Sequence, residues 1–259
     1  MPFAALPDVT IHYALTGNSA HPPLILSNSL GADFSMWDAQ TLVFERHFHL
    51  LRYDMRGHGK SSSPPPPYSV AQLATDLLAL ADSVGFSQFN LCGLSVGGMI
   101  GMHLALYSPA RLKKLILCNT APKIGTDEMW NARIETVRTK GMGEVAKLTP
   151  ARWFTPSFQA GHADRVAASL RVLEALNPEG YVGGCCAVRD FDVRSEIARI
   201  RVPTLVVSGT HDPAATAADG RVLAEHISGA RYVELNTSHI SSVEDPAGLN
   251  EAVLSFLKN

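Results

Sequence analysis

The chain has 259 residues, of which 46% are hydrophobic and 18% are charged. A chain of this length and composition can bury one large core, and this excludes an intrinsically disordered protein. Its formal net charge of -2 at pH 7 gives no basic surface, so neither nucleic acid nor an anionic membrane is expected as a partner.

The predicted secondary structure starts with an antiparallel pair of strands at residues 2–6 and 9–15, separated by Pro7 and Asp8. After this pair, short apolar strands alternate with helical segments. The later strands are predicted at residues 24–27, 48–53, 89–92, 112–118, 203–208 and 232–235. The helices between them are predicted at 37–44, 70–84, 96–107, 215–227 and 246–257. This alternation predicts an α/β fold, in which a mostly parallel eight-stranded sheet is flanked by helices.

Residues 122–189 interrupt the alternation. They are helical in pattern, rich in Arg, Trp and Gly, and contain no convincing strand. Because they come between the sixth strand and the seventh, we expect a helical cap over the carboxyl ends of the strands. The predicted core domain therefore comprises residues 1–121 and 200–259, and the cap is an insertion over residues 122–199. A cap of this kind closes a site against water and supplies substrate contacts.

A serine between two glycines follows the predicted strand 89–92. Gly93, Ser95 and Gly97 form the pattern G-x-S-x-G directly before the predicted helix 96–107. The glycines are needed because a β-carbon at either position would collide with the neighbouring strand or helix. The turn pushes the hydroxyl of Ser95 out above the sheet, and the next helix points its first amides toward a developing oxyanion. This arrangement predicts a nucleophilic serine.

A general base and an acid that orients it are expected further along the chain. Asp212 follows the predicted strand 203–208, and His239 follows the predicted strand 232–235. Both side chains are therefore expected at the carboxyl ends of strands, at the same edge of the sheet as Ser95. The sequence predicts the catalytic triad Ser95, Asp212 and His239.

Other histidines compete with His239 for the role of base, since the chain has ten of them. His47 and His49 share one face of a predicted strand but lack a third metal ligand. His58 is expected to brace the fold in a loop, and His103 is expected to be structural within a helix. Neighbours in one loop rarely form an acid–base pair, which excludes His211 beside the proposed acid. No metal and no cofactor are expected.

An arginine of the cap is the candidate for substrate binding. Trp130, Arg133, Ile134 and Val137 follow the helical spacing i, i+3, i+4, i+7, which places Arg133 on or beside an apolar stripe. A buried guanidinium requires an anionic partner, and a carboxylate of the substrate is one candidate. Trp130 and Trp153 are expected to line the same pocket, with packing in the core of the cap as the alternative for Trp153.

Two alternatives to this role of Arg133 stay open. Its partner is either the substrate or an internal acid such as Asp127 or Glu128, unless the side chain snorkels to solvent. Arg138 and Arg152 are the other arginines that could take the substrate carboxylate.

Four local strings narrow the assignment. They are residues 27–33 (SNSLGAD), 53–59 (YDMRGHG), 117–126 (LCNTAPKIGT) and 238–241 (SHIS). With the G-x-S-x-G turn and the order of the triad residues, they resemble the α/β-hydrolase superfamily over nearly the whole chain and, within it, the 3-oxoadipate enol-lactonases. The string that leads into the cap is the most specific of the four. Many superfamily members carry His-Gly where this chain has Asn28-Ser29, and the lactonases are similar to this chain there.

The resemblance implies hydrolysis of 3-oxoadipate enol-lactone to 3-oxoadipate, in the β-ketoadipate pathway of aromatic degradation. Ser95 would attack the lactone carbonyl, while His239 takes the proton and Asp212 holds the imidazole. The backbone N–H groups of Leu30 and Val96 would form the oxyanion hole, each contributing about 3 kcal/mol of transition-state stabilisation. The expected partner is a small-molecule lactone.

Other functions stay open because a fold does not fix an activity. A carboxylesterase, or a hydrolase of carbon–carbon bonds in ring-fission products, would use the same triad with a different pocket. A cofactor-free haloperoxidase-like activity would be a side reaction of the triad. A small-molecule receptor on the same scaffold would show very low turnover.

The N-terminus and the cysteines predict the compartment. Met1-Pro2-Phe3 runs directly into strand-like sequence without a signal-peptide pattern, and every apolar run is too short to span a bilayer. The four cysteines are Cys92, Cys118, Cys185 and Cys186. They lack metal-ligand spacing, and two are adjacent, which disfavours a disulfide framework. We expect free thiols in a cytoplasmic protein.

Overall fold

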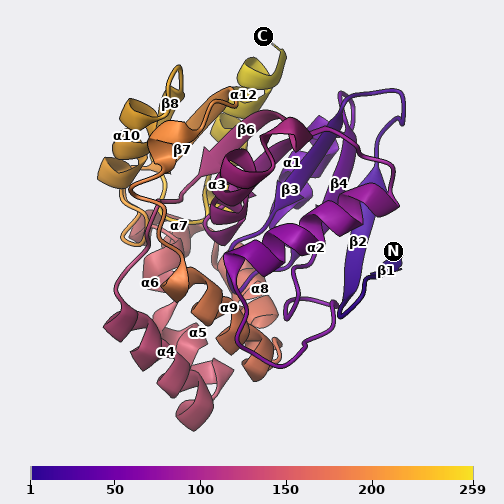
Figure 1. Cartoon of the computed structure of the whole chain (residues 1–259). Coiled ribbons are helices and arrows are strands. Elements are labelled where there is room, and N and C mark those ends of the chain that lie inside the picture. The colour runs from indigo at the N-terminus through magenta and orange to yellow at the C-terminus, as the bar shows by residue number, and fades with distance from the viewer. Residues whose placement is uncertain (1, 259) are drawn as a thin grey trace.

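The computed structural model describes residues 2–258, so the predicted limits of the core domain at residues 1 and 259 lie outside the described residues. Its centre is an eight-stranded sheet (Figure 1). The strands are β1 (Phe3–Ala5), β2 (Thr10–Thr16), β3 (Pro23–Ser27), β4 (His49–Tyr53), β5 (Phe89–Leu94), β6 (Leu112–Cys118), β7 (Thr204–Gly209) and β8 (Arg231–Leu235). Their order across the sheet is β1-β2-β4-β3-β5-β6-β7-β8.

The strand directions confirm the predicted α/β fold. β2 is antiparallel to both of its neighbours, β1 and β4. Every other neighbouring pair, from β4 with β3 to β7 with β8, is parallel. Each residue of β5 and of β7 is buried, as a parallel sheet covered on both faces requires.

Six helices accompany the sheet outside the long insertion. They are α1 (Asp38–Phe44), α2 (Val70–Ser83), α3 (Val96–Tyr107), α10 (Ala217–His226), α11 (Ser241–Glu244) and α12 (Pro246–Lys258). α2 and α3 contact each other in front of the sheet, and α1 contacts α12 (Figure 1). All five predicted helices are present, whereas α11 was not predicted because one turn is too short to show a helical period.

The start of the first predicted helix, at residue 37, lies one residue before that of α1. A 3-10 turn over Phe34–Trp37, which was not predicted, precedes α1. Asp33 caps this turn, because its carboxylate accepts the backbone N–H of Ser35 over 2.9 Å.

The segment between β6 and β7 consists of helices. They are α4 (Asp127–Lys140), α5 (Met142–Leu148), α6 (Pro150–Trp153), α7 (Pro156–Gly161), α8 (Ala163–Glu174) and α9 (Pro178–Asp190). They gather at one end of the sheet (Figure 1). Val193 N–H donates to Pro122 O over 3.0 Å and so joins the two chain segments at the base of this group.

Helix α9 approaches the core through a pair of glycines. A β-carbon on Gly180 would lie 2.6 Å from the carbonyl oxygen of Gly57 and 2.7 Å from its Cα atom. Gly57 has φ 74°, a value that a residue with a side chain rarely adopts. Only glycine on both sides therefore allows this helix to touch the loop that follows β4.

Within residues 2–258, none of the helices combines the length and the apolar character needed to cross a membrane.

Candidate active site

Ser95 lies in a strained turn between β5 and α3. Its φ of 58° and ψ of -116° are unfavourable for a residue with a side chain. A β-carbon on Gly93 would lie 2.1 Å from the carbonyl oxygen of Gly97, and one on Gly97 would lie 2.3 Å from that of Ser27. The turn is fixed further by Thr120, whose hydroxyl donates to Ser95 O over 2.8 Å. Both glycines of the G-x-S-x-G pattern therefore serve the close approach that the sequence predicts.

His239 and Asp212 form a buried pair. Nδ1 of His239 lies 2.8 Å from Oδ2 of Asp212, and both residues are at most 5% exposed. Because an ionised carboxylate only accepts hydrogen bonds, this contact places the ring proton on Nδ1 and leaves Nε2 as a base.

The carboxylate of Asp212 has several other donors. Its Oδ1 accepts the backbone N–H groups of Ala214 over 2.8 Å and of Ala215 over 3.1 Å. Burial raises the pKa of Asp212, but His239 and these amides outweigh burial, so the pKa lies below its usual value. Asp212 is therefore ionised at neutral pH and is a negatively charged partner for His239.

Asn119 is a site residue that the sequence analysis did not identify. Its Nδ2 donates to Asp212 Oδ2 over 3.1 Å and to Ser238 O over 3.0 Å. Its Oδ1 accepts the hydroxyl of Ser241 over 2.6 Å. The string 117–126, used above only for its resemblance, thus contains the amide that joins the ends of three strands. No local signal predicts these partners, since they lie far away along the chain.

Two backbone amides near the serine in the fold have no hydrogen-bond acceptor among the described residues. Ser29 N–H and Gly31 N–H are engaged by Met36 Sδ and His58 Nε2, and Ser95 N–H and Gly97 N–H are engaged by Cys118 O and Asn28 O. In the sequence, Leu30 lies between Ser29 and Gly31, and Val96 lies between Ser95 and Gly97. The N–H groups of Leu30 and Val96 have no acceptor among the described residues. Val96 is the first residue of α3, where an amide has no partner within the helix.

One cavity contains all the predicted site residues except Asp212 and Val96. Its lining includes Leu30, Ser95, Trp130, Arg133, Trp153 and His239. Arg152 and Tyr181 line it as well. Arg138 does not, because its side chain is exposed on the outer side of α4. The structure therefore brings the serine and the histidine together with aromatic rings and two arginines.

Neither arginine of the cavity has a carboxylate partner among the described residues. Nη1 of Arg133 donates to the hydroxyl of Tyr181 over 3.0 Å, and its guanidinium lies 5.8 Å from the ring centre of Trp130. For Arg152, burial and the charge of Arg133 both lower the pKa. Two cations of this kind create a site for an anion.

The internal salt bridge considered for Arg133 is wrong. Asp127 pairs with Lys123 over 3.1 Å, and the side chain of Glu128 is exposed at the first turn of α4. Arg133 instead turns toward α9, because the Tyr181 hydroxyl offers an acceptor inside the cavity.

The chain is similar in sequence to known hydrolases. The family model described as "alpha/beta hydrolase fold" matches residues 22–246. The chain is 42% identical to 3-oxoadipate enol-lactonase 2 of Acinetobacter baylyi, and the alignment covers 97% of this chain and 94% of that protein.

Solved structures are similar over the whole chain. The crystal structure of the enol-lactonase from Burkholderia xenovorans LB400 has a TM-score of 0.98 at 43% identity and covers 100% of both chains. A hydrolase from Pseudomonas aeruginosa PA01 has a TM-score of 0.97 at 42% identity, with coverage of 100% of this chain and 98% of that one.

Proposed function

The chain belongs to the α/β hydrolase family, and we propose that it opens the ring of 3-oxoadipate enol-lactone to give 3-oxoadipate. One observation carries this proposal. Ser95 and His239 share their cavity with Arg133 and Arg152, two cations that have no carboxylate partner among residues 2–258. The lactone brings both an ester carbonyl for the serine and a free carboxylate for the arginines. The proteins from Acinetobacter baylyi and Burkholderia xenovorans LB400 are named enol-lactonases, which supports the same substrate.

The first half of the proposed reaction forms an acyl-enzyme. Ser95 Oγ attacks the lactone carbonyl while Nε2 of His239 takes its proton. Asp212 holds the imidazole and stabilises its charged form. The oxyanion accepts hydrogen bonds from the Leu30 and Val96 amides. When the ester C–O bond breaks, the enol oxygen leaves with the proton from His239, and the enol becomes a ketone that stays attached to the acyl chain.

The second half returns the serine. Nε2 of His239 takes a proton from water, and the hydroxide adds to the acyl carbon. The same two amides stabilise the second tetrahedral intermediate. Its collapse releases 3-oxoadipate and gives the proton back to Ser95 Oγ. The net change is lactone plus water to a dicarboxylate, with no electron transfer.

The two arginines provide substrate selection in this proposal. A guanidinium binds a carboxylate through charge-assisted hydrogen bonds, which are stronger than bonds between neutral groups. Arg133 is already oriented by Tyr181 and Trp130, so little side-chain freedom is lost when the substrate binds. We assign the substrate carboxylate to Arg133 and place Arg152 beside it. Trp130 and Trp153 supply apolar walls.

We also propose that the protein works in the cytoplasm. All four cysteines are buried free thiols, and the sulfur atoms of Cys92 and Cys118 lie 3.8 Å apart in a thiol hydrogen bond and not in a disulfide. Two thiols this close can remain free in the cytoplasm, because that compartment keeps cysteines reduced.

The experiment that tests the function follows the loss of enol-lactone absorbance with the wild type and with Ser95→Ala. An aryl ester and an uncharged methyl-substituted enol-lactone, which lacks the carboxylate, serve as comparison substrates. Fast turnover of the charged lactone, slow turnover of both comparison substrates and an inactive Ser95→Ala support the proposal. Preference for the ester overturns the lactonase assignment, and lactone turnover by Ser95→Ala overturns the acyl-enzyme mechanism.

A further inference from the structure

His58 lies in the loop after β4, away from the cavity lining, and its ring joins two main-chain groups. Nδ1 is 3.1 Å from the carbonyl oxygen of Arg56, and Nε2 is 3.1 Å from the backbone nitrogen of Gly31. A carbonyl can only accept and an amide N–H can only donate, so the ring carries its proton on Nδ1 and accepts at Nε2. Residue 58 is 2% exposed.

The neutral ring that these two bonds require is favoured by its surroundings. Burial lowers the pKa of His58, and this effect outweighs the nearby carbonyl and carboxylates that act in the opposite direction. His58 is therefore a constant acceptor for Gly31 at neutral pH.

The acceptor matters because Gly31 is next to Leu30. The N–H of Gly31 lies in the peptide plane between the two residues, and the φ and ψ rotations at the Leu30 Cα atom separate this plane from the one that contains the N–H of Leu30. Fixing the Gly31 amide therefore restricts the direction in which Leu30 N–H points. On the other side, the acceptor of Ser29 N–H among residues 2–258 is the thioether of Met36 at 3.4 Å, and a thioether is a weak acceptor.

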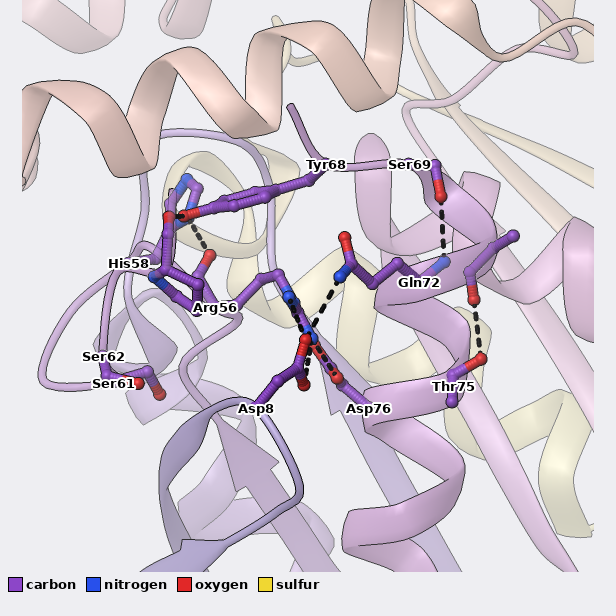
Figure 2. A network of polar contacts seen from close by, with 12 residues as sticks. Asp8, Arg56, His58, Ser61, Ser62, Tyr68, Ser69, Gln72, Thr75 and Asp76 are labelled. Carbon is purple, nitrogen blue, oxygen red and sulfur yellow. Dashed lines mark hydrogen bonds and ion pairs between the residues drawn. The ribbon is translucent and has the colours of Figure 1, made fainter. Parts of the chain in front are cut away.

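Nδ1 of His58 contacts the carbonyl of Arg56, and the Arg56 side chain lies in an ion network with the buried Asp76 and the exposed Asp8 (Figure 2). Arg56 makes two 2.6 Å contacts with Asp76 and contacts Asp8 at 3.1 and 3.2 Å. Its guanidinium also lies 5.5 Å from the ring centre of Tyr68. This network holds the backbone of Arg56, and so the carbonyl to which His58 donates, in one place.

We propose that His58 is a positioning residue that sets the orientation of the Leu30 N–H in the oxyanion hole. The inference rests on the proposed function, because it requires Leu30 to donate to the oxyanion of a Ser95 reaction. It adds a role for a side chain that contacts neither the serine nor the cavity. The loop that the sequence analysis expects to brace the fold thus also determines a catalytic geometry.

The test separates the hydrogen bond from the space that the ring fills. A β-carbon on Gly184 of α9 would lie 3.2 Å from His58 Cε1 and 2.5 Å from Leu30 Cδ1, so the ring packs tightly. His58→Leu fills most of this space without an acceptor. His58→Gln supplies an amide oxygen that can accept from Gly31 and an amide N–H that can donate to Arg56 O. His103→Gln, at a half-buried position of α3 beside Tyr107, is the matched control.

We expect His58→Leu to lower kcat about 10- to 100-fold with KM nearly unchanged, for the lactone and for an aryl ester alike. His58→Gln should recover most of the loss, and His103→Gln should resemble the wild type. Equal kcat losses in the Leu and Gln variants, or a lowered Tm with unchanged kcat, would overturn the proposal. A wild-type protein that cleaves the ester but not the lactone would refute the proposed substrate, and the ester data would still decide the role of His58.

A second measurement does not depend on the folding of a variant. The ring nitrogens of His58 are observed by NMR in wild-type protein that contains isotope-labelled histidine. A protonated Nδ1 and an unprotonated Nε2 are expected at neutral pH. A proton on Nε2 would overturn the inference, because Gly31 N–H would then have no acceptor.

Discussion

Asn119 donates from Nδ2 to Oδ2 of Asp212 over 3.1 Å, and it does so from a left-handed backbone with φ 45°. Asparagine tolerates this conformation better than most residues with a side chain. The end of β6 thereby holds the acid at the end of β7. The same amide group binds the carbonyl of Ser238 and the hydroxyl of Ser241, on either side of His239.

Replacement of Asn119 should therefore lower kcat more than it changes KM. We expect Asn119→Ala to lose about tenfold, because Asp212 and Ser238 each lose a buried donor. Asn119→Asp should lose more, since a second carboxylate beside Asp212 disfavours its ionised form. Steady-state kinetics on the lactone measures both effects, with Asn18→Ala in an exposed loop as the control. An Asn119→Asp variant as active as the wild type would contradict this role.

The arginines of the cavity give a prediction about substrate charge. Arg133→Ala should raise KM for the charged lactone about tenfold or more, because a charge-assisted hydrogen bond contributes about 1.5–3 kcal/mol. The uncharged lactone should be unaffected. Arg152→Ala should have a smaller effect in the same direction. Arg138→Ala, at an exposed position of the same helix as Arg133, is the control. An unchanged KM for the charged lactone in Arg133→Ala would refute the assignment of the carboxylate.

The sequence predicts a helix or strand correctly where neighbouring residues determine its ends. The bounds of α3 and of β6 are the predicted ones, because a glycine-flanked serine, a proline and an apolar run mark their ends within the sequence itself. The 3-10 turn before α1 was missed because it depends on a single cap by Asp33.

Partners from distant parts of the chain could not be predicted in the same way. In the sequence, Asn119 is a polar residue after a strand with no further signal. Its role depends on Asp212 and Ser238, which the ends of β7 and β8 place beside it. For Arg133, the nearest acids in the sequence suggested an internal salt bridge. In the structure Asp127 forms an ion pair with Lys123, and Arg133 points toward α9. Charge and spacing on one helix do not report which other helix faces it.

The contact of α9 with the core predicts opposite effects for two glycine substitutions. Gly180→Ala should destabilise the protein by about 1–3 kcal/mol, because its β-carbon would meet backbone atoms of Gly57 that cannot move aside. Gly143→Ala in α5 has no atom within 4 Å of its new β-carbon, so it should stabilise the protein by up to about 1 kcal/mol through helix propensity. Urea unfolding measures both. A stabilised Gly180→Ala would show that the helix does not lie against this loop.

Alkaline pH should destabilise the protein through Tyr181. Burial raises the pKa of Tyr181 to about 12, although the neighbouring Arg133 acts in the opposite direction. In the unfolded chain the phenol ionises with its ordinary pKa of about 10. The unfolded state therefore loses this proton first, and the stabilisation, complete below about pH 10, disappears as pH rises toward 12. Tyr181 alone should cost about 1 kcal/mol between about pH 9 and about pH 11.

Tyr181→Phe isolates this contribution. Its free energy of unfolding should fall by about 1 kcal/mol less than that of the wild type over the same pH interval, because Phe has no proton to lose. The absolute stabilities of the two proteins can differ, since the variant also lacks the hydroxyl that accepts from Arg133, and only the difference in slope is diagnostic. Urea unfolding at several alkaline pH values provides the slopes. Equal slopes would mean that the Tyr181 phenol ionises as readily in the folded cavity as in the unfolded chain, and that Arg133 faces a phenolate at high pH.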